Sequence, residues 1–345
     1  MNHYFYHFPY KPSLILTVIF LLWGCDQPTV QKISGEAQGT TYHISFWSAQ
    51  ATDMQAIKQA VDGEFKRIDQ LLSNYRPDSA IEQLNATVSS EPQAVNEEII
   101  ALIEQARIVS IASAGCYDLT IKPLFDLWGF KANKFSPPAQ KTLQSTLQEV
   151  GFEKIEILDK NHLRRLNPEL KIDLSSIAQG YSVGRIAALL EQQGMDNYLV
   201  EIGGELQTRG QKPGGEAWRI ALEKPLSDER TMQKIITIEQ AEPMTVMTSG
   251  TYRHYFDDHG KRYSHILDAR RGIPVEHNTV SVTVFHNDPT QADAWSTALL
   301  CLGRMAGLDA ANKAGIAALF IEQQDKSFNE FNSTALQALH TVTIK

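Results

Sequence analysis

The chain has 345 residues, of which 43% are hydrophobic and 21% charged, and its formal net charge is −8. This composition is ordinary for a soluble globular protein, and the length suffices for one large domain or two small ones. Nucleic-acid binding depends on an excess of Lys and Arg that neutralises phosphates, so an acidic chain of this kind predicts no nucleic-acid partner.

The first 24 residues have the pattern of a secretory signal. Lys11 precedes a short apolar run, residues 13–22, which is too short to span a bilayer comfortably. The next residues, Leu22-Trp23-Gly24-Cys25, resemble a bacterial lipobox, which implies cleavage before Cys25 and lipid on its sulfur. An uncleaved anchor helix is the alternative, and either one places the chain at a membrane surface outside the cytoplasm.

The lipobox divides the chain into three parts. We expect residues 1–24 to be a lipoprotein signal peptide, 25–35 a lipidated Cys with a tether, and 36–345 one catalytic domain. Asp26 directly after Cys25 matches the sorting pattern for retention at the inner membrane of a Gram-negative host. The expected location is therefore the cell inner membrane, with the domain lipid-anchored and facing the periplasm.

Two further cysteines, Cys116 and Cys301, remain after cleavage. In an oxidising compartment they are able to pair. However, Cys301 lies in the apolar run 298–302, and this context favours a buried free thiol.

Helical and strand patterns alternate along the mature chain without a regular βα repeat. Alternation predicts a strand over 40–47, and apolar residues at helical spacing predict a helix over 52–72. Further helices are predicted from Asn96 to about Ser113, from Ser136 to Gly151, and over 176–193 and 292–302; strands are predicted near 154–158, 162–166, 170–174 and 197–208, over much of 218–284, and in the tail. This order predicts the α+β class, with mixed, largely antiparallel sheets, packed helices and one catalytic domain that leaves room for two lobes.

Familiar nucleotide and hydrolase motifs are missing. No G-x-G-x-x-G follows a strand, and no Walker A sequence, G-x-S-x-G elbow or H-E-x-x-H helix occurs. The chemistry must therefore come from less common constellations.

The segment 292–297 offers oxygen ligands on one helix face. Asp293 and Thr297 are four residues apart, with Ser296 beside them. Mg²⁺ prefers such hard oxygen ligands, with phosphate and water completing its shell. The alternative is that Asp293 only favours the helix dipole while Thr297 bonds back to a carbonyl.

Three other segments carry weaker signals. Residues 173–181 lead an apolar strand into a helix whose free amides attract phosphate, although Ser175 also fits as a plain helix cap. Backbone groups of the turn 113–118 are able to read a purine edge. His265, in segment 264–268, suits proton transfer or phosphate binding, although a strand His often has only a structural role.

In this order, the segments resemble the ApbE family of FAD:protein FMN transferases. The resemblance rests on residues 73–79, 125–130, 173–181, 201–205, 264–274 and 292–295. It implies Mg²⁺-dependent transfer of FMN from FAD, the substrate, to a Ser or Thr hydroxyl of an acceptor protein, with release of AMP. Family acceptors are subunits of envelope electron-transport complexes, such as the sodium-pumping NADH:quinone oxidoreductase and the Rnf complex.

The resemblance also implies site residues. It places FAD contacts at Gln38, Tyr75, Cys116, Tyr117, Asp118, Asp173, Gln179 and Ile266, and Mg²⁺ ligands at Ser176, Asp293, Ser296 and Thr297, some of them through backbone carbonyls. His265 and Asp293 are the candidates for the catalytic base. Gln179 departs from the family pattern, in which Lys is usual, and Ser296 stands for the usual Ala.

Two other functions stay open at this point. A Mg²⁺-dependent FAD pyrophosphatase would use water in place of the protein hydroxyl, giving FMN and AMP. A flavin-binding lipoprotein would hold FAD without catalysis. Tyr75 fits the transferase, and the intact Asp293/Thr297 pair argues against a non-catalytic protein.

Overall fold

The computed structural model describes residues 1, 3, 29–226, 232–325 and 327–345. The predicted signal peptide and the lipobox, with Cys25, lie outside the described residues apart from positions 1 and 3. Within the described part of the chain, no helix has the length and apolar character needed to cross a membrane.

Helices and strands are interleaved along the described part of the chain. The α-helices are α1 Met54–Leu72, α2 Ala80–Ala86, α3 Glu97–Ala112, α4 Lys122–Leu127, α5 Gln140–Leu147, α6 Ala178–Gln192, α7 Pro289–Ala314 and α8 Thr334–Gln337, with 3-10 turns η1 Leu119–Ile121 and η2 Phe152–Lys154. The strands are β1 Gln31–Ala37, β2 Thr40–Trp47, β3 Gln93–Ala94, β4 Ile155–Asp159, β5 His162–Arg165, β6 Asn197–Ile202, β7 Glu205–Arg209, β8 Trp218–Glu223, β9 Met232–Ile238, β10 Met244–Gly250, β11 Tyr255–Asp258, β12 Lys261–Ser264, β13 Leu267–Asp268, β14 Ile273–Pro274, β15 Thr279–His286, β16 Ala317–Gln324, β17 Ser327–Asn332 and β18 Val342–Ile344.

An eight-stranded sheet forms the centre of the molecule. Its strand order is β1-β2-β6-β7-β10-β15-β16-β17, and each of its pairs is antiparallel. The predicted α+β class with largely antiparallel sheets is confirmed.

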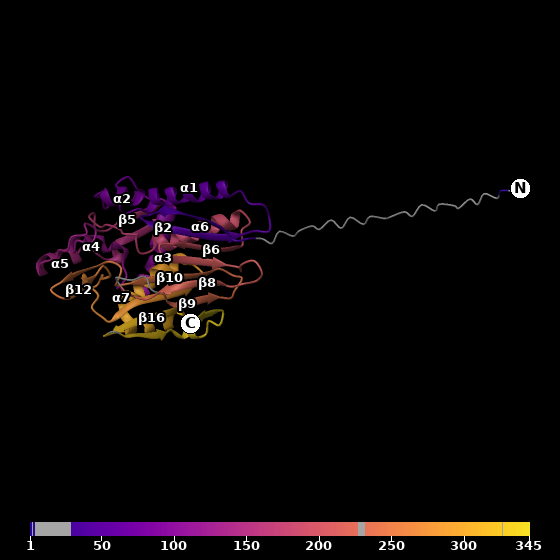
Figure 1. Ribbon diagram of the computed structural model, residues 1–345. Coiled ribbons are helices and arrows are strands. Elements are labelled where there is room, and N and C mark those ends of the chain that lie inside the picture. The colour runs from indigo at the N-terminus through magenta and orange to yellow at the C-terminus, as the bar shows by residue number, and fades with distance from the viewer. Residues whose placement is uncertain (2, 4–28, 227–231, 326) are drawn as a thin grey trace.

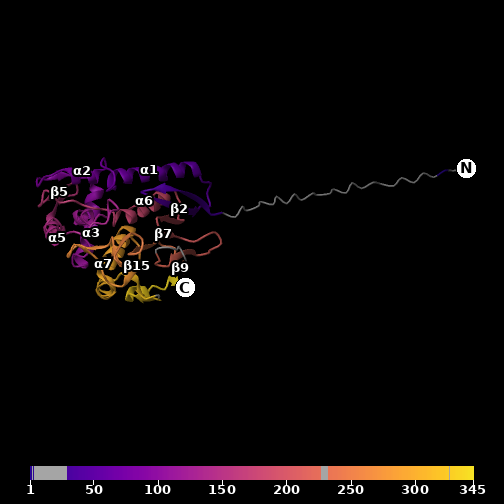
Figure 2. The ribbon, with the colours of Figure 1, turned by 60° about the vertical axis from the view of Figure 1, so that its left-hand side comes forward.

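The two faces of this sheet are covered differently. Alternating residues such as Met247, Val284 and Phe320 pack against α1, α3, α6 and α7, whereas their neighbours Val246 and Phe285 pack against a small sheet. That small sheet has the order β18-β9-β8. Figures 1 and 2 show α1 and α2 along the upper edge of the molecule and the C-terminal strands along the lower edge.

Local sequence explains the first long helix. Asp53 caps α1 by accepting hydrogen bonds from the amides of Gln55 and Ala56 at 3.0 Å, and apolar residues at helical spacing are buried beneath it. The prediction of a helix over 52–72 is confirmed to within two residues.

The starts of α6 and α7 meet at Gly180. A Cβ at this position would collide with the carbonyl of Pro289 and with the side chain of Asp293. Glycine therefore allows the two helix starts to approach, and this approach brings Asp293 beside the segment that precedes α6.

Several predicted boundaries differ from the structure. The predicted tether ended at residue 35, but residues 31–37 form the edge strand β1. The helix predicted from Ser136 begins only at Gln140. Residues 170–174 form no strand, because side chains take their backbone amides: the Ile172 N–H donates to Asn85 and the Leu174 N–H to Asn74.

Candidate active site

A cavity of about 290 Å³ lies where the starts of α6 and α7 face the end of β10. Its lining includes every predicted site residue of the mature domain except Gln38 and Ser296: Tyr75, Cys116, Tyr117, Asp118, Asp173, Ser176, Gln179, His265, Ile266, Asp293 and Thr297. Residues that are as much as 222 positions apart in the sequence, Tyr75 and Thr297, are thus brought to one place.

Oxygen atoms from α7 and β10 form a connected cluster at one wall. The Asp293 carboxylate accepts a hydrogen bond from the Gly180 N–H at 2.7 Å. Ser249 on β10 lies 3.1 Å from the Thr297 hydroxyl and 2.8 Å from the Ser296 hydroxyl. Ser296 itself is fully buried and donates to the Asp293 carbonyl, so its hydroxyl does not reach the cavity. A ligand role for Ser296 stays a prediction, and only its carbonyl remains available for it.

Burial makes the Asp293 carboxylate hard to ionise. Desolvation raises its pKa to about 7, against a smaller opposite effect of the Gly180 amide. A buried anion with a single backbone donor needs a positive partner. The groups that surround it are hydroxyls and carboxylates, whose oxygen atoms are the ligands that a hard divalent cation prefers.

Glu205, at the start of β7, is a cavity residue that the sequence prediction missed. Burial raises its pKa well above the ordinary value, and the nearby charge of Asp293 acts in the same direction. Its carboxylate accepts the Thr248 N–H at 2.9 Å, where β7 and β10 have stopped pairing. A sequence signal that could have identified Glu205 is the Gly203-Gly204 turn directly before this acid, which is part of the family resemblance.

His265 has a fixed tautomer. Its Nδ1 lies 2.8 Å from the His254 carbonyl, so Nδ1 carries the proton and donates, while Nε2 remains an acceptor. Desolvation lowers its pKa to about 4. The ring is therefore neutral at pH 7 and able to accept a proton at Nε2.

The polar residues near the turn 116–118 are held by the protein itself. The Asp118 carboxylate accepts the amides of Thr120 and Phe152, and the Ser176 hydroxyl lies 3.2 Å from the Tyr117 hydroxyl. The Asp118 side chain thus fixes the shape of the turn, leaving mainly backbone groups for a ligand.

A second hollow of about 630 Å³ adjoins the first. It is lined by Gln38, among others, and it shares Tyr75, Ser175 and Gln179 with the cavity. Gln38 donates to Ser182 at 2.8 Å, and Gln179 donates to the Ile202 carbonyl at 2.7 Å. Two connected hollows suit an elongated ligand such as a dinucleotide.

Cys116 and Cys301 form a disulfide, which corrects the prediction that Cys301 is a buried free thiol. The apolar run around Cys301 was read correctly as buried, but it packs against the turn that carries Cys116. Asp268 lies close to both sulfurs and is itself paired with Arg270 at 2.7 Å. The bond ties the turn 116–118 to α7, across the cavity.

Removing this disulfide should destabilise the protein. It closes a loop of 185 residues, and loops of that size predict a loss of about 2–5 kcal/mol in unfolding free energy when both cysteines become alanine. Chemical denaturation with and without reductant measures the loss.

The reductant supplies the control for this prediction. It should destabilise the wild type to the level of the double alanine variant and leave that variant unchanged. If the unfolding midpoint of the wild type is the same with and without reductant, the two cysteines are not bonded in solution.

Known proteins share both this sequence and this fold. The model of the ApbE family matches residues 38–320. A FAD:protein FMN transferase of Vibrio cholerae is 36% identical over 326 residues, which cover 93% of this chain and 96% of the relative. That of Escherichia coli K12 is 32% identical over 337 residues, or 94% and 95% of the two chains.

Solved structures agree with the sequence matches. The flavin transferase ApbE of Vibrio cholerae superposes with a TM-score of 0.80 at 34% identity, covering 90% of this chain and 99% of the other. The apo form of the Pseudomonas stutzeri flavinyl transferase gives 0.82 at 34% identity, covering 91% and 97%. The fold and the cavity therefore place the chain in a class of enzymes, the flavin transferases. Within that class, the chain belongs to the ApbE family.

Proposed function

We propose that this enzyme transfers FMN from FAD to a Ser or Thr hydroxyl of an acceptor protein, with Mg²⁺ as cofactor and AMP as the second product. The observation that carries the proposal is the buried Asp293 carboxylate beside Thr297 and Ser176, in a cavity that continues into a second hollow. The named activity of the 36% and 32% identical relatives supports it.

The residues present fit Mg²⁺. Asp293, Thr297 and Ser176 offer hard oxygens, and the raised pKa of Asp293 shows a buried carboxylate that lacks a positive partner. When bound, the ion would neutralise negative charge that grows on the pyrophosphate oxygens during displacement.

The chain's own groups would do the rest. The acceptor oxygen forms a bond to the FMN phosphorus, the bond from that phosphorus to the AMP oxygen breaks, and the hydroxyl proton must leave. His265 lines the cavity and its Nε2 is unprotonated, so it is the better placed of the two candidate bases. Asp293 is the poorer candidate, because a carboxylate bound to a cation is a weaker base than a free one.

The location is part of the proposal. A disulfide between Cys116 and Cys301 suits an oxidising compartment, which supports a domain facing the periplasm. We propose that a lipid on Cys25 anchors it to the inner membrane, and that its acceptors are subunits of envelope electron-transport complexes such as the sodium-pumping NADH:quinone oxidoreductase or Rnf.

One experiment separates the transferase from its alternatives. The purified enzyme is incubated with FAD, Mg²⁺ and the flavin-free periplasmic domain of such a subunit, and AMP and the acceptor mass are measured. AMP together with a mass gain of one FMN supports transfer. AMP with free FMN would indicate a pyrophosphatase, and neither product would indicate a binding protein.

A further inference from the structure

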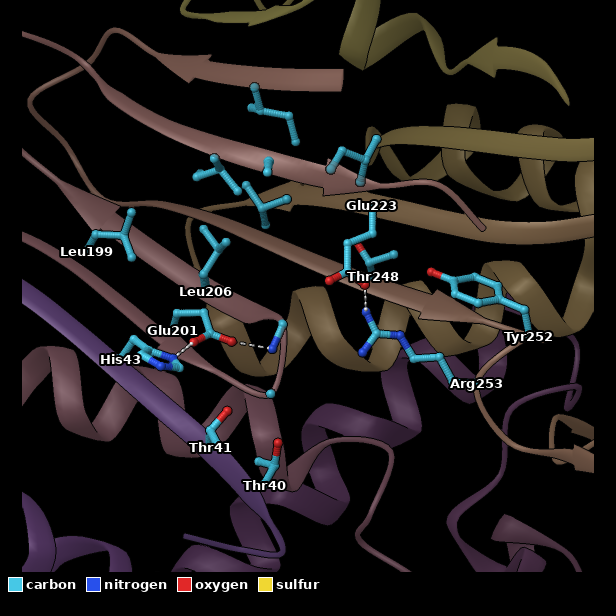
Figure 3. Close-up of a pocket in the computed structure, with 17 residues that line it drawn as sticks. Thr40, Thr41, His43, Leu199, Glu201, Leu206, Glu223, Thr248, Tyr252 and Arg253 are labelled. Carbon is cyan, nitrogen blue, oxygen red and sulfur yellow. Dashed lines mark hydrogen bonds and ion pairs between the residues drawn. The ribbon is translucent and has the colours of Figure 1, made fainter. Parts of the chain in front are cut away.

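A third hollow, of about 380 Å³, lies on the opposite face of the central sheet from the long helices. Its floor is apolar, with Leu199, Leu206 and Val246 from the central sheet and Ile220 and Leu222 from β8. Figure 3 shows this groove between the sheet face and β8. None of the predicted FAD or metal residues lines it.

Two polar side-chain pairs mark the ends of the groove. The His43 ring lies 2.8 Å from the Glu201 carboxylate, and the Arg253 guanidinium lies 3.3 Å from that of Glu223. In Figure 3 the first pair lies at one side of the hollow and the second at the other. An apolar floor with polar ends suits a polypeptide segment better than a small charged ligand.

β8 presents an unused backbone edge to this groove. Ile235 on β9 exchanges both of its backbone hydrogen bonds with Lys345, on the far side from β8. Its partner on β8 is Ala221, so this pair is not hydrogen-bonded and the N–H and C=O of Ala221 point away from β9. Among the described residues these two groups have no backbone partner, and Ala221 is an exposed residue of the groove lining.

The groove joins the candidate active site at one end. Thr248 and Arg253 line both the groove and the cavity. The Gly203-Gly204 turn lies between the groove and Gln179, which lines both the cavity and the second hollow. A Cβ on Gly203 would collide with Gln179, and one on Gly204 would lie 3.4 Å from Arg253. A strand that follows β8 toward Glu223 therefore arrives at Arg253 and the mouth of the cavity.

We propose that the acceptor protein binds here, by adding the segment next to its Ser or Thr as an extended strand on the edge of β8. This rests on the proposed transferase function, which requires a polypeptide substrate. Main-chain hydrogen bonds to Ala221 would supply affinity with little sequence demand, and an apolar side chain of the acceptor would fill the hollow. The groove differs from the two hollows assigned to FAD, and it reaches the cavity through the shared residues Thr248 and Arg253.

Ala221→Pro tests the backbone edge. Proline removes the outward N–H, whereas the β8–β9 bonds made by Ile220 and Leu222 remain, and edge strands tolerate proline. The KM for the acceptor domain should rise about tenfold, with kcat and the KM for FAD within about twofold. Ala221→Thr keeps the N–H and should behave as wild type.

Two further measurements keep the proposal falsifiable. Leu199→Lys places a charge in the half-buried floor and should also raise the acceptor KM alone. Hydrogen exchange of residues 219–223 in the wild type should slow when the acceptor domain is added. If the wild type transfers FMN and both variants fold but keep the wild-type KM for the acceptor, the docking site is wrong. The proposed transferase function would still stand.

Other results bear on other occupants. Slower exchange at 219–223 that depends on enzyme concentration, without acceptor, would assign the edge to a second copy and overturn the proposal. A wild type that yields no FMN-labelled acceptor would instead contradict the function itself.

Discussion

Replacing Asp293 with Asn should lower the rate of FMN transfer by about a hundredfold to a thousandfold or more. The same change should make the metal-free protein more stable. The amide oxygen of Asn still accepts the Gly180 N–H, so the packing of α6 on α7 is kept. The charge that would hold Mg²⁺ is lost. Rates come from the FMN-transfer assay, and stabilities from thermal unfolding in chelator.

The stability effect depends on pH in a defined direction. Burial raises the Asp293 pKa to about 7, so between about pH 4 and 7 the folded protein holds a proton that the unfolded chain has released. Wild-type stability should therefore fall as pH rises through this window, by about 4 kcal/mol for three pKa units. The Asn variant lacks this loss, and Mg²⁺ should stabilise the wild type more at pH 8 than at pH 5.

Asp309→Asn provides the matched control. Asp309 lies on the same helix, is largely exposed, pairs with Lys313 at 2.7 Å and does not line the cavity. Its replacement should change stability by less than about 1 kcal/mol and leave the rate unchanged. An Asp293→Asn enzyme that transfers FMN at the wild-type rate would remove Asp293 from the reaction.

Local signals explain what the sequence predicted well. Asp53 and Asn96 lie directly before periodic apolar residues, and each caps the helix that was expected there. Such signals depend on only a few neighbouring residues, so helix starts can be predicted without knowledge of the rest of the fold.

The errors arose where distant residues decide the structure. Residues 170–174 have the composition of a buried strand, but Asn85 and Asn74, which lie 87 and 100 positions before their partners, accept hydrogen bonds from the amides of this segment. The helix predicted to end at Leu302 continues to Ala314 beyond a break at Gly303, whose φ is 70°. No local pattern announces such partners.

The candidate site shows the same division. The resemblance placed Asp293, Thr297 and His265, and the structure gathers them around one cavity. Glu205 was missed, because a lone acid after two glycines also fits an exposed turn. The Cys116–Cys301 bond spans 185 residues and could not be read from spacing.

Replacing His265 with Gln should lower kcat by about a hundredfold or more while leaving FAD and Mg²⁺ binding nearly unchanged. Glutamine keeps a hydrogen-bonding side chain in the cavity but cannot take the acceptor proton as Nε2 does. A selective loss of kcat would separate His265 from Asp293 as the base, because loss of Asp293 should also weaken Mg²⁺ binding. Added imidazole should restore part of the rate, and more so at a pH where imidazole is neutral.

The two roles considered for His265 predict different pH profiles. Desolvation lowers its pKa to about 4, so a base at this position is already unprotonated from pH 5 upward, and its own titration should leave the rate flat from there to pH 8. A phosphate-binding role needs the protonated ring, and the rate would then rise as the pH falls toward 4.

His254→Gln is the control for His265→Gln. The His254 ring stacks on His265 at 5.4 Å, but only the His254 carbonyl bonds Nδ1 of His265, so the loss of kcat in this variant should stay below about tenfold. Equal losses in the two variants would contradict proton transfer by His265, because the shared effect would then lie in the packing of the two rings.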